Sequence, residues 1–287
     1  MTENANHDQS ELWNGRSGSA WVDNRAALDQ MFVPLARFLI DRARDVARHT
    51  PSGRLLDVGC GTGGATLALS TALGHSWQLT GADISAPIIE TARTRAAHAR
   101  APVEFLCADV QTHQFQQAHF DLIVSRLGVM FFDDPIAAFA NLRASARPGA
   151  ALHSLVWRGP SENPFMTVAE RVAAPLLSGL PPRQPGAPGQ FGFADPERVA
   201  SILSSAGWEE VHLEPVHFDC TFAQADLRDY ASRLGPVGLA LAGLDPAKRE
   251  HIVDAIVDAY APFVAQGEVR FSSACWHLSA RAPSGDV

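Results

Sequence analysis

Apolar residues follow two different spacings along the chain, and segments with the two spacings alternate. Short runs dense in apolar residues predict strands that are covered by other parts of the protein. These runs lie at residues 54–58, 78–84, 102–110, 120–126, 151–157, 208–218 and 268–279. Apolar residues at steps of three and four predict helices with one buried face at residues 23–48, 65–73, 85–98, 135–146 and 195–206. Strands that alternate with helices are typical of an α/β fold with a parallel sheet.

The first strand leads directly into a glycine-rich turn. Residues 54–64 read R-L-L-D-V-G-C-G-T-G-G. Gly59, Gly61 and Gly63 allow the backbone to turn tightly and to approach a ligand where a Cβ atom would clash. The helix that begins at Thr62 or Gly63 then presents its free N–H groups to that ligand. This arrangement predicts a site for a nucleotide-like ligand.

One acidic residue separates two kinds of nucleotide site. Gly59, Gly61 and Gly64 also fit the dinucleotide pattern G-x-G-x-x-G, which is a weak signal on its own. Asp57 would repel a pyrophosphate, whereas it would attract a ligand with an ammonium group and a sulfonium. Asp57, Gly59, Gly61 and Gly63 match D-x-G-x-G-x-G, the first motif of the class I S-adenosylmethionine (SAM)-dependent methyltransferases. The sequence resembles this family, and the resemblance implies SAM as the cofactor.

The resemblance also implies a fold and a domain arrangement. We expect a Rossmann-like, doubly wound α/β sheet of seven strands, mostly parallel with an antiparallel last strand, plus an N-terminal helical segment and lid insertions. A flexible segment or lid at residues 1–22 would precede a single methyltransferase domain at residues 23–287. That domain would contain a proline- and glycine-rich cap at about residues 160–193 and a helical insertion at about residues 223–266. A plain surface loop is the alternative for the cap.

Acidic residues end the second and third predicted strands. Asp83 lies roughly 20 residues beyond the glycine turn, where Rossmann-like folds place a carboxylate on the ribose hydroxyls. Its alternative role is a solvated cap. By the resemblance, Asp109 would meet the adenine amino group and Val110 would pack on the adenine ring. The expected cofactor residues are Asp57, Gly59, Cys60, Gly61, Gly63, Asp83, Ile84, Asp109, Val110, Ser125 and Trp21.

Three residues near the expected carboxyl edge of the sheet are candidates for catalysis. Arg126 and Arg158 each follow a strand and could hold an anion bidentately. Each could equally form a salt bridge with a loop acid such as Asp133. His113 could act as a general base, but its polar segment, residues 111–119, is more typical of exposed surface.

Charge and composition favour a small-molecule acceptor. The formal net charge is −8 and the pI about 5.7, so the basic surface that phosphate backbones require is missing. The N/D-P-P-Y/F motif of amino-methylating DNA and glutamine methyltransferases does not follow residues 120–126. His212 and His217 would point to opposite faces of a strand, and the four cysteines are far apart, so we predict no metal site.

Transfer of a methyl group from SAM to a partly apolar or carboxylate-bearing metabolite is the function that these features favour. One alternative is a SAM-binding enzyme of the same fold without methyl transfer, because no general base is assured. A second is an NAD-dependent dehydrogenase, which the glycine pattern permits. The accepting atom, whether oxygen, nitrogen, carbon or sulfur, stays open. We expect a cytoplasmic protein, monomeric or homodimeric, because neither a signal peptide nor a membrane-spanning pattern is evident.

Overall fold

A mixed sheet organises the protein in the computed structural model, which describes residues 6–177, 180 and 182–284. The strand order is β3-β2-β1-β4-β5-β8-β6, and β7 pairs with β8. β8 runs antiparallel to β5 and β6, whereas the pairs among β1 to β5 are parallel. The strands are β1 (Gly53–Val58), β2 (Trp77–Asp83), β3 (Val103–Cys107), β4 (Phe120–Arg126), β5 (Ala146–Trp157), β6 (Glu209–Ala223), β7 (Val264–Ala265) and β8 (Glu268–Arg281). The predicted fold is confirmed, except that the two-residue β7 makes an eighth strand.

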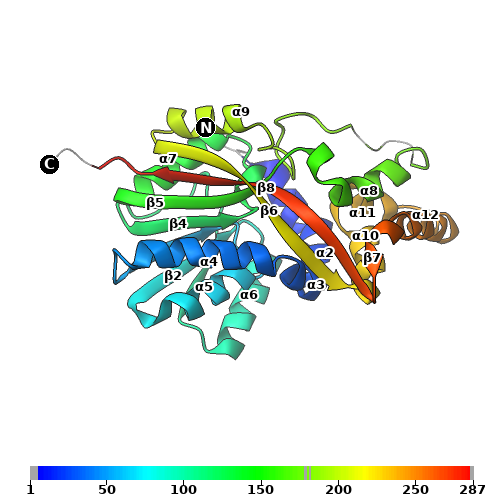
Figure 1. Cartoon of the computed structure of the whole chain (residues 1–287), viewed down its shortest axis with the longest axis horizontal. Helices are drawn as coiled ribbons and strands as arrows, with labels where there is room; N and C mark the ends of the chain where they lie inside the picture. The colour runs from blue at the N-terminus through cyan, green and yellow to red at the C-terminus, as the bar shows by residue number, and fades with distance from the viewer. Residues whose placement is uncertain (1–5, 178–179, 181, 285–287) are drawn as a thin grey trace.

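Helices cover both faces of the sheet (Figure 1). The chain winds outward from β1 in both directions, and right-handed crossovers then place α5 and α6 opposite α7. α4 packs beside α5, and α9 beside α7. The helices are α1 (His7–Asn14), α2 (Arg16–Asp23), α3 (Arg25–Met31), α4 (Val33–Ala47), α5 (Gly64–Leu73), α6 (Ala86–Ala99), α7 (Pro135–Ser145), α8 (Pro164–Ala173), α9 (Pro196–Ser205), α10 (Leu227–Arg233), α11 (Gly235–Leu241) and α12 (Pro246–Ala259). Single 3-10 turns occur at Gly74–Ser76, Val129–Phe131, Pro160–Glu162, Gln224–Asp226 and Ala261–Phe263.

The sheet separates two hydrophobic cores, because successive side chains of a strand point to opposite faces. On one face, Leu55 of β1 packs in a cluster with Leu69 of α5. On the other face, Leu56 and Ile123 belong to the cluster that contains Phe139 of α7. All five side chains are almost completely buried. Burial on both faces explains why the central strands read as continuous apolar runs in the sequence.

Several predicted elements end at different residues in the structure. The predicted helix at residues 23–48 is divided into α3 and α4, because Pro34 has no N–H to donate and favours the first turn of a new helix. β3 stops at Cys107, before the predicted end at residue 110. There the N–H of Ala108 donates to the carbonyl oxygen of Asp83, and the chain turns away. These differences leave the order of the elements unchanged.

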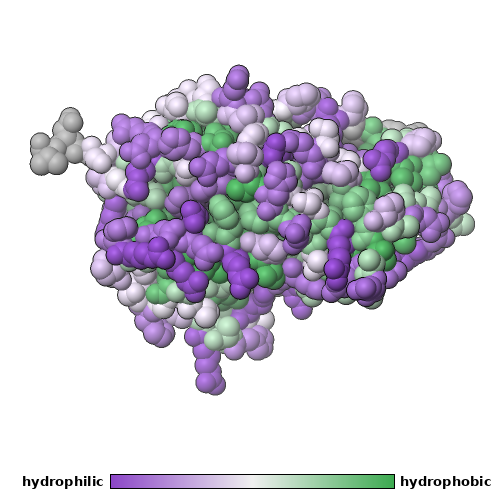
Figure 2. All heavy atoms as spheres, in the orientation of Figure 1, coloured by the Kyte–Doolittle hydropathy of each residue, from purple (hydrophilic) through white to green (hydrophobic). Residues whose placement is uncertain are grey.

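The inserted segments build a helical lobe beyond one end of the sheet (Figure 1). α8 packs against α11 and α12, and the long strands β6 and β8 extend toward these helices. Phe165 of α8 stacks on Phe271 of β8 with 3.9 Å between ring centroids. Figure 2 shows hydrophobic atoms reaching the surface over this lobe. The two insertions therefore form one packed unit. Every helix that the structure describes is too short or too polar to span a bilayer.

Candidate cofactor and acceptor site

The glycine turn after β1 uses its three predicted glycines in different ways. All three have positive φ, of 64° at Gly59, 57° at Gly61 and 80° at Gly63. A Cβ atom on Gly59 would lie 2.7 Å from Cα of Gly128, and one on Gly63 would lie 2.7 Å from Cζ of Phe105. A Cβ on Gly61 would meet only the Trp21 indole nitrogen, at 3.5 Å. Gly59 and Gly63 are thus required by the packing of the protein, whereas Gly61 faces open space.

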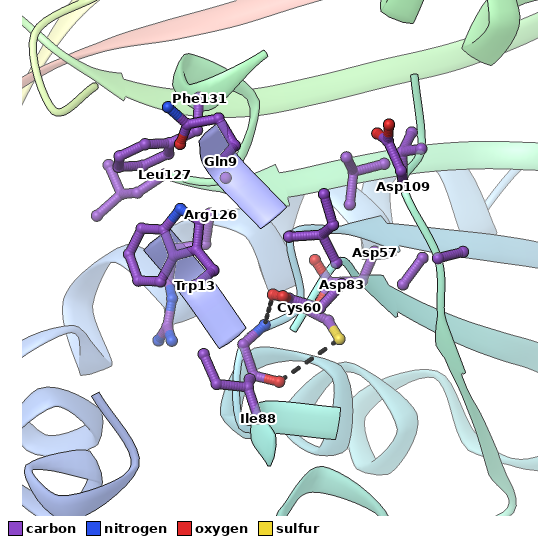
Figure 3. A pocket seen from close by; sticks show the side chains of 18 of the residues that line it. Gln9, Trp13, Asp57, Cys60, Asp83, Ile88, Asp109, Arg126, Leu127 and Phe131 are labelled. Atoms are coloured by element: carbon purple, nitrogen blue, oxygen red, sulfur yellow. Dashed lines mark hydrogen bonds between the residues drawn. The ribbon is translucent and has the colours of Figure 1, made fainter. Parts of the chain in front are cut away.

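That open space is a cavity at the carboxyl ends of the parallel strands (Figure 3). Open α/β sheets place their ligands at this edge. All but two of the predicted cofactor residues line the cavity, namely Trp21, Asp57, Gly59, Cys60, Gly61, Asp83, Ile84, Asp109 and Val110. Arg126, one of the catalytic candidates, lines it as well. The structure therefore brings together residues that lie far apart in the sequence.

The two exceptions, Gly63 and Ser125, act within the protein framework. Gly63 is the N-cap of α5 and packs against the Phe105 ring. The fully buried Ser125 hydroxyl donates to the carbonyl oxygen of Val58 at 2.7 Å and accepts from the N–H of Gly128 at 3.2 Å. Ser125 therefore ties the ends of β1 and β4 together beneath the cavity.

Asp57 is a buried carboxylate in the cavity wall. It is 1% exposed, and one of its oxygens accepts a hydrogen bond from the Thr66 hydroxyl at 2.7 Å. Burial raises the pKa of Asp57 to about 6, although the Thr66 hydrogen bond and the positive charge of Arg126 oppose this shift. A cationic ligand group beside Asp57 would favour its ionised form.

The other two acidic residues are oriented by backbone N–H groups. Asp83 accepts from the N–H groups of Gly61 and Ser85, both at 3.0 Å. Burial raises the pKa of Asp83, and these hydrogen bonds lower it. Asp109 accepts from the N–H of Gln111 at 2.9 Å and from the Asn6 amide at 3.1 Å. A carboxylate has about four lone-pair sites, so both side chains keep acceptor capacity for a ligand.

His113 and Arg158, the other two catalytic candidates, are not among the residues that line the cavity. The His113 ring packs against Phe115 with 4.6 Å between centroids. Arg158 forms an ion pair with Glu162 and lies over the Trp276 ring, 4.6 Å from its centroid. The salt bridge with a loop acid is therefore the correct interpretation for Arg158, with Glu162 as the acid.

Helix α1 forms one wall of the cavity and is fixed to the connection between β2 and α6. The Ser85 hydroxyl donates to the carbonyl oxygen of Trp13 at 2.6 Å. The Asn14 amide donates to the carbonyl oxygen of Ile84 at 3.2 Å, and its Oδ1 accepts from the N–H of Ala86 at 2.9 Å. These contacts place Trp13 in the cavity wall.

The sequence predicted a flexible segment or lid at residues 1–22, and the structure has helices α1 and α2 there, from His7 onward. Residues 1–5 lie outside the described residues. Asn6, Gln9 and Trp13 line the cavity without having been predicted as site residues. Asn6 Oδ1 and Gln9 Oε1 are buried without a hydrogen-bond partner in the part of the chain that the structure describes. The sequence predicted Trp21 of this segment as a cofactor residue, but Asn6 and Gln9 gave no signal.

A second, larger cavity adjoins the first on the side of the helical lobe. Its volume is about 410 Å³, and its wall comes from α8, α10, α11 and residues 182–192 as well as the N-terminal helices. Trp13 stands in its wall with the Phe131 ring edge-on at 5.2 Å. Most side chains of the wall are apolar, and Glu170 and Arg183 pair with each other within it. The residues that line both cavities are Gln9, Trp13, Trp21, Phe32, Leu127 and Phe131.

Known proteins are similar to this chain in sequence. Residues 55–149 match the family model of a methyltransferase domain. Demethylmenaquinone methyltransferase of Thermus thermophilus is 30% identical over 182 residues, which cover 58% of this chain and 79% of that protein. The chain belongs to the class I SAM-dependent methyltransferases. An uncharacterised methyltransferase of Mycobacterium tuberculosis is 34% identical over 107 residues, 37% of this chain and 52% of its own length, so the match spans about half of that relative.

A crystal structure from Bacillus halodurans agrees with this methyltransferase in its fold. The TM-score is 0.55 at 18% identity, over 85% of this chain and 98% of the other. The cofactor of the family is SAM, and the cavity fits it. Gly61 leaves room for a ligand, Asp57 offers a carboxylate to an ammonium group, and the unpaired oxygens of Asn6 and Gln9 can accept ligand hydrogens. These groups suit both the methionine end and the adenosine end of SAM.

Proposed function

We propose that this methyltransferase transfers a methyl group from SAM to a small, largely apolar acceptor molecule. The observation that carries this proposal is the shared wall of the two cavities. A cavity with acidic groups at three strand ends adjoins a larger apolar one, and six side chains line both. A cofactor in the first cavity and an acceptor in the second would therefore meet at this wall.

The residues that would hold SAM follow the order of the strands. Asp57 would bind the ammonium group, Asp83 the ribose hydroxyls, and Asp109 with Val110 the adenine; all four line the cavity. When bound, SAM supplies an electrophilic methyl group. The protein contributes binding and orientation, and both depend on the backbone N–H groups that fix Asp83 and Asp109.

The wall between the cavities supports transfer by excluding water. Trp13, Trp21 and Phe131 pack edge to face there, with ring centroids 5.2 and 5.9 Å from Trp13. None of the six shared side chains titrates, since they are Gln, Trp, Trp, Phe, Leu and Phe. At this wall the chain offers alignment and a dry environment, which strengthens the electrostatic attraction between a nucleophile and the cationic cofactor.

The lining of the second cavity favours an apolar acceptor over a carboxylate-bearing one. The Arg183 side chain donates to Glu170 at 2.7 Å, so its charge is already compensated. A cavity of this volume and lining suits a molecule of the size of a typical metabolite. The name of the Thermus relative, a demethylmenaquinone methyltransferase, supports a small-molecule acceptor as well. The net charge of −8 argues against nucleic acid. A cytoplasmic location and a monomeric or homodimeric state stay predictions.

The test measures whether S-adenosylhomocysteine is released only when an acceptor is present. Purified protein is incubated with SAM carrying an isotopically labelled methyl group and with fractions of a small-molecule extract. Mass spectrometry should find S-adenosylhomocysteine together with a labelled product, enriched in the apolar fractions. A compound transformed while SAM stays intact would instead support an enzyme of this fold that does not transfer methyl groups. No release with any fraction would contradict the proposal.

A further inference from the structure

Arg126 is a charged side chain in the wall of the cofactor cavity, and none of the described residues pairs with it. It is the last residue of β4, and its guanidinium lies 5.4 Å from the centroid of the Phe32 ring. Other arginines near the sheet have oxygen partners. Arg95 pairs with Asp29 at 2.6 Å, and Arg147 pairs with Asp121 at 2.7 Å. Among the described residues, no hydrogen bond or ion pair engages Arg126, so its N–H groups remain available to the cavity.

An unpaired guanidinium in a cavity is costly unless a ligand compensates it. Burial lowers the pKa of Arg126, and the negative charges of Asp29 and Asp57 oppose this shift. Arginine nevertheless stays protonated in proteins, so the positive charge persists. Stacking on the face of Phe32 leaves the edge of the guanidinium free, and this edge is the part that binds carboxylates bidentately.

Arg126 and Asp57 give the cavity one positive and one negative group. Both residues line the same cavity (Figure 3), and each charge shifts the pKa of the other group. A ligand that carries an ammonium and a carboxylate on one carbon atom matches this pair in sign. We propose that Arg126 binds the α-carboxylate at the methionine end of SAM while Asp57 binds the ammonium. This inference rests on SAM binding by the proposed enzyme, but not on the transfer of its methyl group.

The location of Arg126 favours binding of the SAM carboxylate over binding of an anionic acceptor. Arg126 lines only the cofactor cavity, whereas its neighbour Leu127 lines both cavities. An acceptor in the second cavity would therefore contact Leu127, whereas SAM would occupy the cavity that the guanidinium lines. The geometry makes Arg126 a cofactor-binding residue, in place of the acceptor-side role that the sequence suggested.

The experiment compares ligands that differ only at the carboxylate. Calorimetry measures binding of S-adenosylhomocysteine and of its decarboxylated analogue to wild type and to Arg126→Met. We expect the substitution to weaken S-adenosylhomocysteine binding by roughly 10- to 100-fold, since hydrogen bonds to charged groups are the strong ones. The decarboxylated analogue should bind both proteins equally. Arg126→Lys, which keeps the charge without the planar fork, should give an intermediate loss for S-adenosylhomocysteine.

Two controls keep the result interpretable. Arg158→Met removes a guanidinium outside both cavities and should leave both affinities unchanged. Thermal unfolding of each variant shows whether it is folded. An equal loss of both ligands in Arg126→Met would assign Arg126 a structural role and overturn the proposal. Unchanged S-adenosylhomocysteine binding with a raised KM for the acceptor would overturn it too, in favour of an acceptor anion. Wild type that binds S-adenosylhomocysteine but transfers no methyl would contradict only the proposed function.

Discussion

The two adjoining cavities are built from different parts of the chain and by different means. The cofactor cavity lies on strand ends and a glycine turn, and backbone N–H groups hold its acidic side chains in place. The acceptor cavity is enclosed by α1, α2, the helical lobe and residues 182–192, and side-chain packing gives it its shape. The first wall is fixed by the sheet, whereas the second can change with the inserted segments. Cofactor and acceptor specificity can therefore vary independently in this fold.

The largest expected effect comes from filling the cofactor cavity. Gly61→Val should abolish S-adenosylhomocysteine binding in calorimetry, because a side chain at Gly61 occupies the open space of the cavity and φ is 57° there. Gly74→Val is the matched control, since Gly74 has a φ of 69° and no atom within 4 Å of an added Cβ. That variant should be strained to a similar degree and still bind. Near-normal binding by Gly61→Val would refute the glycine turn as the cofactor site.

A second variant should separate the two cavities. Ala169 of α8 lines only the acceptor cavity, so Ala169→Phe should lower kcat/KM for the acceptor by about tenfold by occupying its space. Binding of S-adenosylhomocysteine should change less than about twofold, because Ala169 does not line the cofactor cavity. Ala174→Phe, at the exposed end of the same helix, is the control. Equal losses of acceptor and cofactor binding in Ala169→Phe would show that the cavities are not independent.

The smallest expected effect is a dependence of stability on pH that the buried Asp57 causes. Its pKa is raised to about 6 in the folded protein, so the folded state binds more protons than the unfolded state between the two pKa values. Stability should therefore fall as pH rises through this range. Wild type should lose about 1 kcal/mol more unfolding free energy than Asp57→Asn between about pH 5 and pH 7. Parallel pH profiles in urea denaturation would contradict the raised pKa.

The sequence predicted the cofactor cavity well because its residues belong to local patterns. Asp57 and Gly61 lie within one turn, and Asp83 and Asp109 each end a strand whose place in the sheet follows from the order of the elements. The predicted cofactor residues that do not line the cavity owe their positions to contacts between distant elements, which a local pattern does not contain. Gly63 faces Phe105 because α5 and β3 pack together.

The sequence did not predict which residues of the N-terminal segment line the cavity, for the same reason. Asn6 and Gln9 line the cavity only because Asn14 bonds to the connection between β2 and α6, which lies far along the chain. Nothing in the polar segment around Gln9 indicates that contact. Arg126 was identified at the right strand end, but the sequence did not show that it lines the first cavity and not the second. Tertiary packing, and not the local sequence pattern, decides where such residues lie.

The attachment of α1 also has a consequence for the order of events in a catalytic cycle. Three hydrogen bonds join Trp13 and Asn14 to the β2–α6 connection, and α1 stands beside the cofactor cavity. A cofactor product that leaves on the side of α1 would have to pass residues that these bonds hold in place. Release of S-adenosylhomocysteine should then be slower than methyl transfer, as is common where a closing segment must open. Rapid mixing with enzyme in stoichiometric amounts should show a burst of methylated product in the first turnover.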